Sequence, residues 1–185
     1  IHGDVLRIIN GGCFETMDGT QHSVTKWDLI IAHPPCTYLT VTGNRWFNVE
    51  RYGDKALQRI KDRTAAAQFF MEFVNADCKH IAIENPVGYM STHYEKPTQI
   101  IQPYMFGHEA EKKTCLWLKN LPKLEATKVV TPPKRVKFKS GKTMPEWYAK
   151  AWRLPADERS KMRSQTFEGI AKAMAEQWGS YINEL

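Results

Sequence analysis

The amino-acid sequence predicts an α/β fold whose sheet is mostly parallel, with an antiparallel hairpin at one edge. Residues 27–32 form a short apolar run that stops at the HPP sequence of residues 33–35, where neither a helix nor a central strand continues. Residues 54–76 repeat apolar side chains at steps of three and four, which is typical of an amphipathic helix. Residues 80–83 form a second apolar run, which Pro86 follows closely.

The order strand, helix, strand implies a right-handed crossover and a parallel pair. Residues 99–102 and 114–118 are two further predicted strands, and the polar connection between them is short enough for a hairpin. A chain of 185 residues favours one domain over two. Within it we expect a core at residues 1–121, a short basic segment at 122–162, and a C-terminal helix at 163–185 that returns to the core.

The composition predicts a folded protein outside the membrane. Hydrophobic residues make up 42% and charged residues 25% of the chain, which is close to the globular average. No apolar run approaches the roughly 20 residues that cross a bilayer. The four cysteines form no CxxC pair and the six histidines no HExxH motif, so we expect neither a disulfide framework nor a metal site. We expect Cys13, Cys78 and Cys115 to be buried.

Positive charge is concentrated in one stretch. Residues 123–143 carry seven lysines and arginines against one glutamate, so this stretch alone holds a net charge of +6, equal to that of the whole chain. Such a basic, proline-containing stretch suits an exposed loop near phosphates. We therefore expect nucleic-acid contacts from Lys134, Arg135 and Lys137.

Two polar clusters follow the two predicted parallel strands. Cys36 comes just after the first strand and its prolines, and Glu84 comes at the end of the second. Because ligands bind outside the carboxyl ends of strands in open α/β sheets, we expect both side chains to open onto one cleft. A thiolate that adds to carbon 6 of cytosine, while a carboxylic acid protonates nitrogen 3, prepares carbon 5 to take a methyl group. The pair therefore predicts chemistry on an extruded cytosine. His33, beside this loop, is expected to face water.

The same segments resemble the DNA cytosine-5 methyltransferases. The sequence DLIIAHPPCT at residues 28–37 is similar to their catalytic loop, and IENP at 83–86 is similar to their ENV segment. GDV at residues 3–5 resembles the strand end that contacts the adenine of S-adenosylmethionine, and residues 163–174 resemble the last family motif. The order of these motifs is most similar to small phage- and prophage-type members. The resemblance implies a Rossmann-like sheet, S-adenosylmethionine as cofactor, DNA as partner, and a cytoplasmic location in a bacterial or phage-infected cell.

The resemblance also implies roles for individual residues. Cys36 would be the nucleophile and Glu84 would hold and protonate the cytosine. The remaining assignments are Lys112 and Lys113 in the catalytic set, Asp4, Pro34, Thr166 and Gly169 for the cofactor, and Pro35, Thr37 and Asn85 for the substrate and its loops.

The sequence departs from the family pattern in three ways. The aromatic-x-Gly-x-Gly turn that packs against the cofactor and the acidic residue that binds its ribose are both missing. Because the sequence begins at Ile1, we expect a longer translated chain whose upstream residues supply both. The alternative is a protein that binds no cofactor. Pro86 replaces the usual valine, and Glu111-Lys112-Lys113 replaces Gln-x-Arg. Lysine does not reproduce the bidentate fork of arginine.

Two other function classes compete with the methyltransferase hypothesis. The missing glycine turn and the lysine pair suit a catalytically inactive DNA-binding protein with the same fold. The Pro-Cys pair also resembles that of thymidylate-synthase-type enzymes, which act on free nucleotides. The basic stretch favours DNA over a free nucleotide.

Overall fold

The structure, a computed structural model, describes residues 3–164 and 166–184 and divides into two compact units. The first unit comprises the residues up to Ile100 together with Thr114–Lys123, and the second comprises Ile101–Lys113 and the chain from Leu124 onward. Ile1, on which the expectation of a longer chain depends, lies outside the described residues. The division into a core at residues 1–121, a basic segment at 122–162 and a C-terminal helix at 163–185 stays a prediction.

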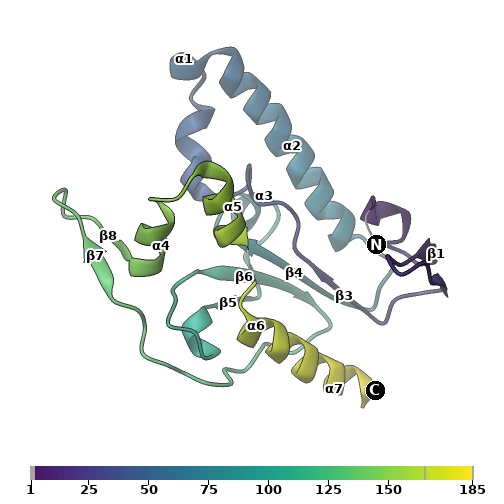
Figure 1. The fold of residues 1–185 in the computed structure, drawn as a ribbon. Coiled ribbons are helices and arrows are strands. Elements are labelled where there is room, and N and C mark those ends of the chain that lie inside the picture. The colour runs from purple at the N-terminus through teal and green to yellow at the C-terminus, as the bar shows by residue number, and fades with distance from the viewer. Residues whose placement is uncertain (1–2, 165, 185) are drawn as a thin grey trace. The chain divides into compact units, whose positions relative to one another are not determined.

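The first unit holds the main sheet and its crossover helix, which can be followed in Figure 1. Its elements, in chain order, are the 3-10 turn η1 (Val5–Arg7), β1 (Gly12–Glu15), β2 (Gln21–Val24), β3 (Leu29–Ala32), the 3-10 segment η2 (Val41–Phe47), α1 (Val49–Tyr52), α2 (Asp54–Val74), β4 (His80–Pro86), α3 (Met90–His93), β5 (Gln99–Ile101) and β6 (Thr114–Lys119).

The main sheet has four strands in the order β3-β4-β6-β5. β3 and β4 run parallel, with Leu29 opposite His80 and Ala32 opposite Ile83. β4 and β6 run antiparallel, with Glu84 opposite Leu116. α2 connects the parallel pair, as the predicted crossover requires.

The prediction of a Rossmann-like, mostly parallel sheet is wrong. The structure has a small mixed sheet and two separate two-stranded antiparallel hairpins, β1-β2 and β7-β8. A parallel pair of strands needs a long crossover, and α2 provides one between β3 and β4. The segment that joins β4 to β5 is short and holds one helical turn, α3. β6 then pairs beside β4 in the interior of the sheet instead of serving only as an edge partner of β5. β4 also runs through Pro86, which was expected to lie beyond the strand's end.

The core of the first unit lies between the sheet and the C-terminal half of α2. Phe70 is fully buried and meets Trp117 of β6 edge-to-face, with ring centroids 5.2 Å apart. Ala67 and Phe73 are buried beside it. In the N-terminal half, Leu57 is 46% exposed, although its spacing places it on the predicted apolar face. The predicted helix is therefore present. Its second half supplies the residues of the main core cluster, whereas Ala56 is buried in the first half.

The second unit is mainly helical, with one small hairpin. Its elements are the 3-10 turn η3 (Pro103–Met105), β7 (Arg135–Lys137), β8 (Thr143–Pro145), α4 (Glu146–Ala151), α5 (Ala156–Ser164), α6 (Glu168–Ala173), the π-helical η4 (Met174–Trp178) and α7 (Gly179–Asn183). Ile170, Met174 and Trp178 are buried and follow one another at steps of four. The helix predicted at residues 168–178 is thus present, and it continues to residue 183.

Candidate active site

The carboxyl ends of β3 and β4 bring two of the predicted segments together. Since Ala32 lies opposite Ile83 in the parallel register, the residues that follow on each strand are also neighbours. His33 Nδ1 lies 3.0 Å from Glu84 Oε2. Asn85 Nδ2 donates a hydrogen bond of 2.8 Å to the carbonyl of Pro34. The proline-cysteine loop and the Glu-Asn-Pro segment therefore form one local structure.

Backbone hydrogen bonds fix the loop that carries Cys36. The Cys36 carbonyl accepts hydrogen bonds from the amides of Leu39 and Thr40, both at 3.0 Å, which close a turn directly after the cysteine. The Leu39 carbonyl then accepts a 2.7 Å hydrogen bond from the amide of Tyr89, and Thr40 forms a β-bridge with Gly88. The cysteine loop is thereby joined to the chain that leaves β4.

Gly88 makes this junction sterically feasible. A β-carbon built on Gly88 would lie 1.9 Å from the Leu39 carbonyl oxygen and 2.9 Å from its carbon. Both atoms belong to backbone, which cannot swing aside as a flexible side chain can. Only glycine therefore allows this close approach.

Two arginines of α2 hold the same loop from the helix side. Arg59 Nη2 donates to the Thr37 carbonyl at 3.2 Å, and Arg63 Nε donates to the Tyr38 carbonyl at 3.0 Å. Arg63 Nη2 also donates to Asn44 Oδ1 at 2.7 Å. Burial lowers the pKa of the Arg63 guanidinium from its ordinary value, although arginine stays charged in proteins.

Exposure divides the residues of this region into accessible and shielded groups. Cys36 is an exposed residue. The side chain of Glu84 is 18% exposed and that of His33 is 39% exposed. Asn85 is buried, and its Oδ1 has no hydrogen-bond partner among the described residues. That the Cys36 thiol and the Glu84 carboxyl open onto one cleft stays a prediction.

Sequence reasoning missed three features of this region. His33 is exposed, as expected, but it also contacts Glu84, a contact that follows only once the parallel register is known. Arg59 and Arg63 were not singled out, although their spacing of four on a predicted helix places them on one face. No sequence pattern pointed to Gly88, because the close approach that requires glycine is between this residue and the distant Cys36 loop at Leu39.

The burial predicted for three cysteines is confirmed at two of them and wrong at the third. Cys78 and Cys115 are buried, as expected. Cys13 was expected to be buried and is exposed on β1, where its sulfur lies 3.6 Å from Ser23 Oγ. The prediction failed because the β1-β2 hairpin stands apart from the main sheet, so no layer covers Cys13.

Local contacts explain most of the residues that were predicted to bind the cofactor. Asp4 Oδ1 caps the η1 turn by accepting a 3.0 Å hydrogen bond from the Leu6 amide. A β-carbon on Gly169 would lie 2.0 Å from the Phe106 carbonyl oxygen. The buried Pro34 supplies the carbonyl that Asn85 binds, and Thr166 is exposed. These contacts account for Asp4, Pro34 and Gly169 within the unit to which each belongs. Cofactor binding at these positions stays a prediction.

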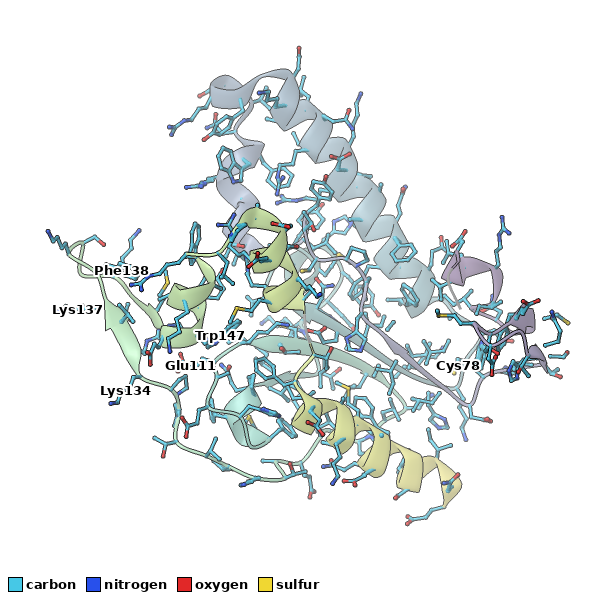
Figure 2. All side chains as sticks on the ribbon, viewed as in Figure 1. Cys78, Glu111, Lys134, Lys137, Phe138 and Trp147 are labelled. Atoms are coloured by element: carbon cyan, nitrogen blue, oxygen red, sulfur yellow. The ribbon has the colours of Figure 1, made fainter. Side chains whose placement is uncertain are left out.

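The predicted basic residues lie in the second unit. Lys112 is half-buried and Lys113 exposed, directly before β6. Lys134 and Lys137 are exposed and lie at the β7-β8 hairpin, as Figure 2 shows.

Arg135 differs from its basic neighbours because it contacts the protein itself. Its Nη1 forms an ion pair with Glu111 Oε2, and its Nε donates to Thr143 Oγ1 at 3.2 Å. Trp147 Nε1 donates to the Glu111 carbonyl at 3.0 Å, so Glu111 joins the hairpin to α4 (Figure 2). Arg135 therefore has a structural role in addition to its predicted contact with nucleic acid.

Comparison with protein-family models and with curated protein sequences gives no match to this chain. In the described part of the chain, no helix has the length and apolar character needed to span a membrane. Within residues 3–164 and 166–184, no group of three or more His, Cys, Asp or Glu side chains is arranged to hold a metal ion.

Proposed function

We propose that the protein is a DNA cytosine-5 methyltransferase whose base-binding groups are the Cys36 loop and the Glu84 segment. The observation that carries the proposal is the union of these two segments at the ends of β3 and β4, through His33 to Glu84 and Asn85 to Pro34. A nucleophile and an acid delivered by neighbouring parallel strands suit a single planar base.

In the proposed reaction the Cys36 thiolate adds to carbon 6 of cytosine. A sulfur–carbon bond forms, the double bond between carbons 5 and 6 breaks, and Glu84 places its proton on nitrogen 3. The resulting enamine is nucleophilic at carbon 5. After carbon 5 takes an electrophile, it loses its original hydrogen as a proton, the double bond returns and the thiolate leaves. Nitrogen 3 gives its proton back to the Glu84 carboxylate, which restores the neutral base and the acid.

His33 and Asn85 support these two groups. Since His33 contacts Oε2 of Glu84, we assign Oε1 to the cytosine. Asn85 fixes the loop through the Pro34 carbonyl and so sets the path of the chain to Cys36. Thr37 and Pro35 complete this loop, and Lys134 and Lys137 contact the DNA backbone. S-adenosylmethionine, which the resemblance implies, supplies the methyl group when bound.

Exchange of the carbon 5 hydrogen tests the proposal directly. DNA that carries [5-³H]cytosine releases tritium whenever the Cys36 adduct forms and takes a proton at carbon 5. The full chain is assayed both with and without S-adenosylmethionine. We expect release by the wild type, background release by Cys36→Ser, and a reduction of about 100-fold for Glu84→Gln, because general acid catalysis contributes about 10²–10⁴-fold.

Cys13→Ser is the matched control, because Cys13 is also exposed but lies on β1. This variant keeps the full rate. Equal tritium release by Cys36→Ser and the wild type would end the covalent mechanism.

A second candidate is a DNA-binding protein without turnover. It is favoured by Glu111, which binds Arg135 and stands where the family has the glutamine of its Gln-x-Arg pair. DNA binding without any Cys36-dependent exchange supports this candidate and contradicts the methyltransferase.

A further inference from the structure

An open cavity of about 670 Å³ lies in the first unit, at the end of η2 and along α1. Its volume falls within the range of about 300–1,000 Å³ that is usual for small-molecule sites. Its lining consists of Asn44, Arg45, Trp46, Asn48, Arg51 and Tyr52. We call these six residues the Trp46 pocket. Apart from Asn44, which accepts a hydrogen bond from Arg63, they have no part in the candidate active site.

Two aromatic rings give the Trp46 pocket flat apolar surface. Trp46 is 41% exposed, and its ring centroid lies 5.0 Å from that of Tyr52, with the planes inclined by 47°. The Arg45 guanidinium carbon lies 4.4 Å from the centroid of the Trp46 ring, and that of Arg51 lies 5.5 Å from the centroid of Tyr52. Each ring thus carries a planar cation, and such ring and guanidinium planes are surfaces on which unpaired bases stack.

The charge of the Trp46 pocket selects an anion. Its lining has two arginines and no acidic residue. Asn44 and Asn48 use their Oδ1 atoms within the protein, for Arg63 and for the Arg51 amide respectively. Their amide NH₂ groups are the donors they offer a ligand. Flat apolar surface, positive charge and amide donors together match a nucleotide, with its base, its polar edge and its phosphate.

Arg63 couples the Trp46 pocket to the Cys36 loop. One of its nitrogens binds the Tyr38 carbonyl in that loop, and another binds Asn44 in the pocket. Its guanidinium carbon also lies 3.3 Å from the centroid of the Phe47 ring, beside Trp46 in the sequence. Arg63 therefore links the Trp46 pocket directly to the loop that carries Cys36.

We propose that the Trp46 pocket binds an unstacked nucleotide of the DNA strand, stacking its base on Trp46 and pairing its phosphate with Arg45 and Arg51. The identity of the polymer rests on the proposed function, whereas the pocket chemistry rests on these six residues. Two sources of DNA present the same groups to the pocket, an unpaired base and its phosphate. The nucleotide comes either from single-stranded DNA or from a duplex that has been locally opened.

Photochemical crosslinking locates the nucleotide in the wild-type chain. Oligodeoxynucleotides that contain 5-iododeoxyuridine are offered as a single strand and as a duplex, and the crosslinked peptide is identified by mass spectrometry. We expect the label on Trp46 or Tyr52, and the more productive oligonucleotide identifies the source of the nucleotide. A label found only on other residues overturns the proposal.

Binding measurements separate stacking from charge. We expect Trp46→Leu to weaken binding of the single strand about 10-fold, within the range measured for base stacking on aromatic side chains. Trp46→Phe keeps a ring and stays within about 3-fold of the wild type. Arg45→Gln and Arg51→Gln each lower the salt dependence, the slope of log K against log salt, by about 0.7. Unchanged affinity of a folded Trp46→Leu variant contradicts the pocket.

Tritium release distinguishes this proposal from the proposed function. If the pocket is wrong, Trp46→Leu binds and exchanges like the wild type while Cys36→Ser remains inactive. If the methyltransferase is wrong, Cys36-dependent exchange is absent while the crosslink to Trp46 persists.

Discussion

His33 and Glu84 form the contact that most directly concerns chemistry at the level of single residues. Their atoms Nδ1 and Oε2 are 3.0 Å apart, and the carboxyl is the more shielded partner, with 18% of its side chain exposed. A hydrogen bond at this distance fixes the rotation of the carboxyl group. In the proposed reaction, His33 is therefore a positioning residue for the acid.

Replacement of His33 by phenylalanine tests this role. The ring is kept but the nitrogen is lost, so we expect kcat for tritium release to fall about 2- to 10-fold, because a hydrogen bond between neutral groups contributes about 0.5–1.5 kcal/mol. KM should change little, and His33→Asn, whose amide can still reach the carboxyl, should recover part of the rate. Steady-state kinetics on labelled DNA measure both constants.

His22→Phe provides the matched control, because His22 is an exposed histidine on β2 of the same unit. It should leave kcat and KM unchanged. A His33→Phe variant with the wild-type rate would remove His33 from the mechanism and leave its contact with Glu84 a purely structural one.

The sequence predicted Cys36 and Glu84 because each lies where an apolar run ends: Cys36 follows the prolines after the first run, and Glu84 stands between the second run and Pro86. It did not predict the contact of His33, since the pairing of residues across two strands depends on register, which is a long-range property. It likewise missed Arg59 and Arg63, whose partners are backbone carbonyls of a loop and leave no pattern in the sequence.

At the scale of elements, the β3-α2-β4 crossover positions the candidate site. The sequence predicted these three elements because each has a local hydrophobic period. It failed on the sheet as a whole, because the interior place of β6 depends on pairing between distant segments. The 3-10 segment η2 and the short α1 also went unpredicted, since neither is long enough to show a period.

The junction between the Cys36 loop and the chain after β4 yields a stability prediction. In Gly88→Ala, the new methyl group meets the Leu39 carbonyl at 1.9 Å, so the two backbones must separate and the Tyr89–Leu39 hydrogen bond is lost. We expect the free energy of unfolding to fall by about 3 kcal/mol, as for other severe backbone clashes. Urea denaturation followed by circular dichroism measures the loss.

Gly3→Ala is the control for this change, because a β-carbon on Gly3 would meet nothing within 4 Å. Its unfolding midpoint should match that of the wild type. If Gly88→Ala unfolds at the same urea concentration as Gly3→Ala, the two loops are not held as closely as the structure indicates.

At the scale of the whole molecule, chemistry and charge fall in different units. The first unit holds Cys36, Glu84 and the Trp46 pocket, and the second holds the basic hairpin. Composition alone predicted the basic stretch, because net charge needs no knowledge of the fold. It did not predict that Arg135 binds Glu111 within the protein, so the exposed lysines are the stronger candidates for phosphate contacts.

The tip of the β7-β8 hairpin carries these lysines on a tight turn. The Phe138 amide donates to the Lys142 carbonyl at 2.9 Å, and Gly141 adopts a φ of +79°, which glycine accommodates without strain. Lys137, Lys139 and Lys142 are exposed along this turn. Their charges are therefore available to a DNA backbone, and their removal should not disturb the core of either unit.

Glutamine substitutions at these lysines test the electrostatic contribution of the hairpin. Each of Lys137→Gln, Lys139→Gln and Lys142→Gln should reduce the salt dependence of duplex binding, the slope of log K against log salt, by about 0.9, because each phosphate contact releases condensed counterions. The melting temperature should stay unchanged. Lys172→Gln is the control, since Lys172 lies on α6 and forms an ion pair of 3.7 Å with Glu176. If this variant lowers the slope as much as the hairpin variants do, the chain binds DNA through its overall charge, and the hairpin has no special part in it.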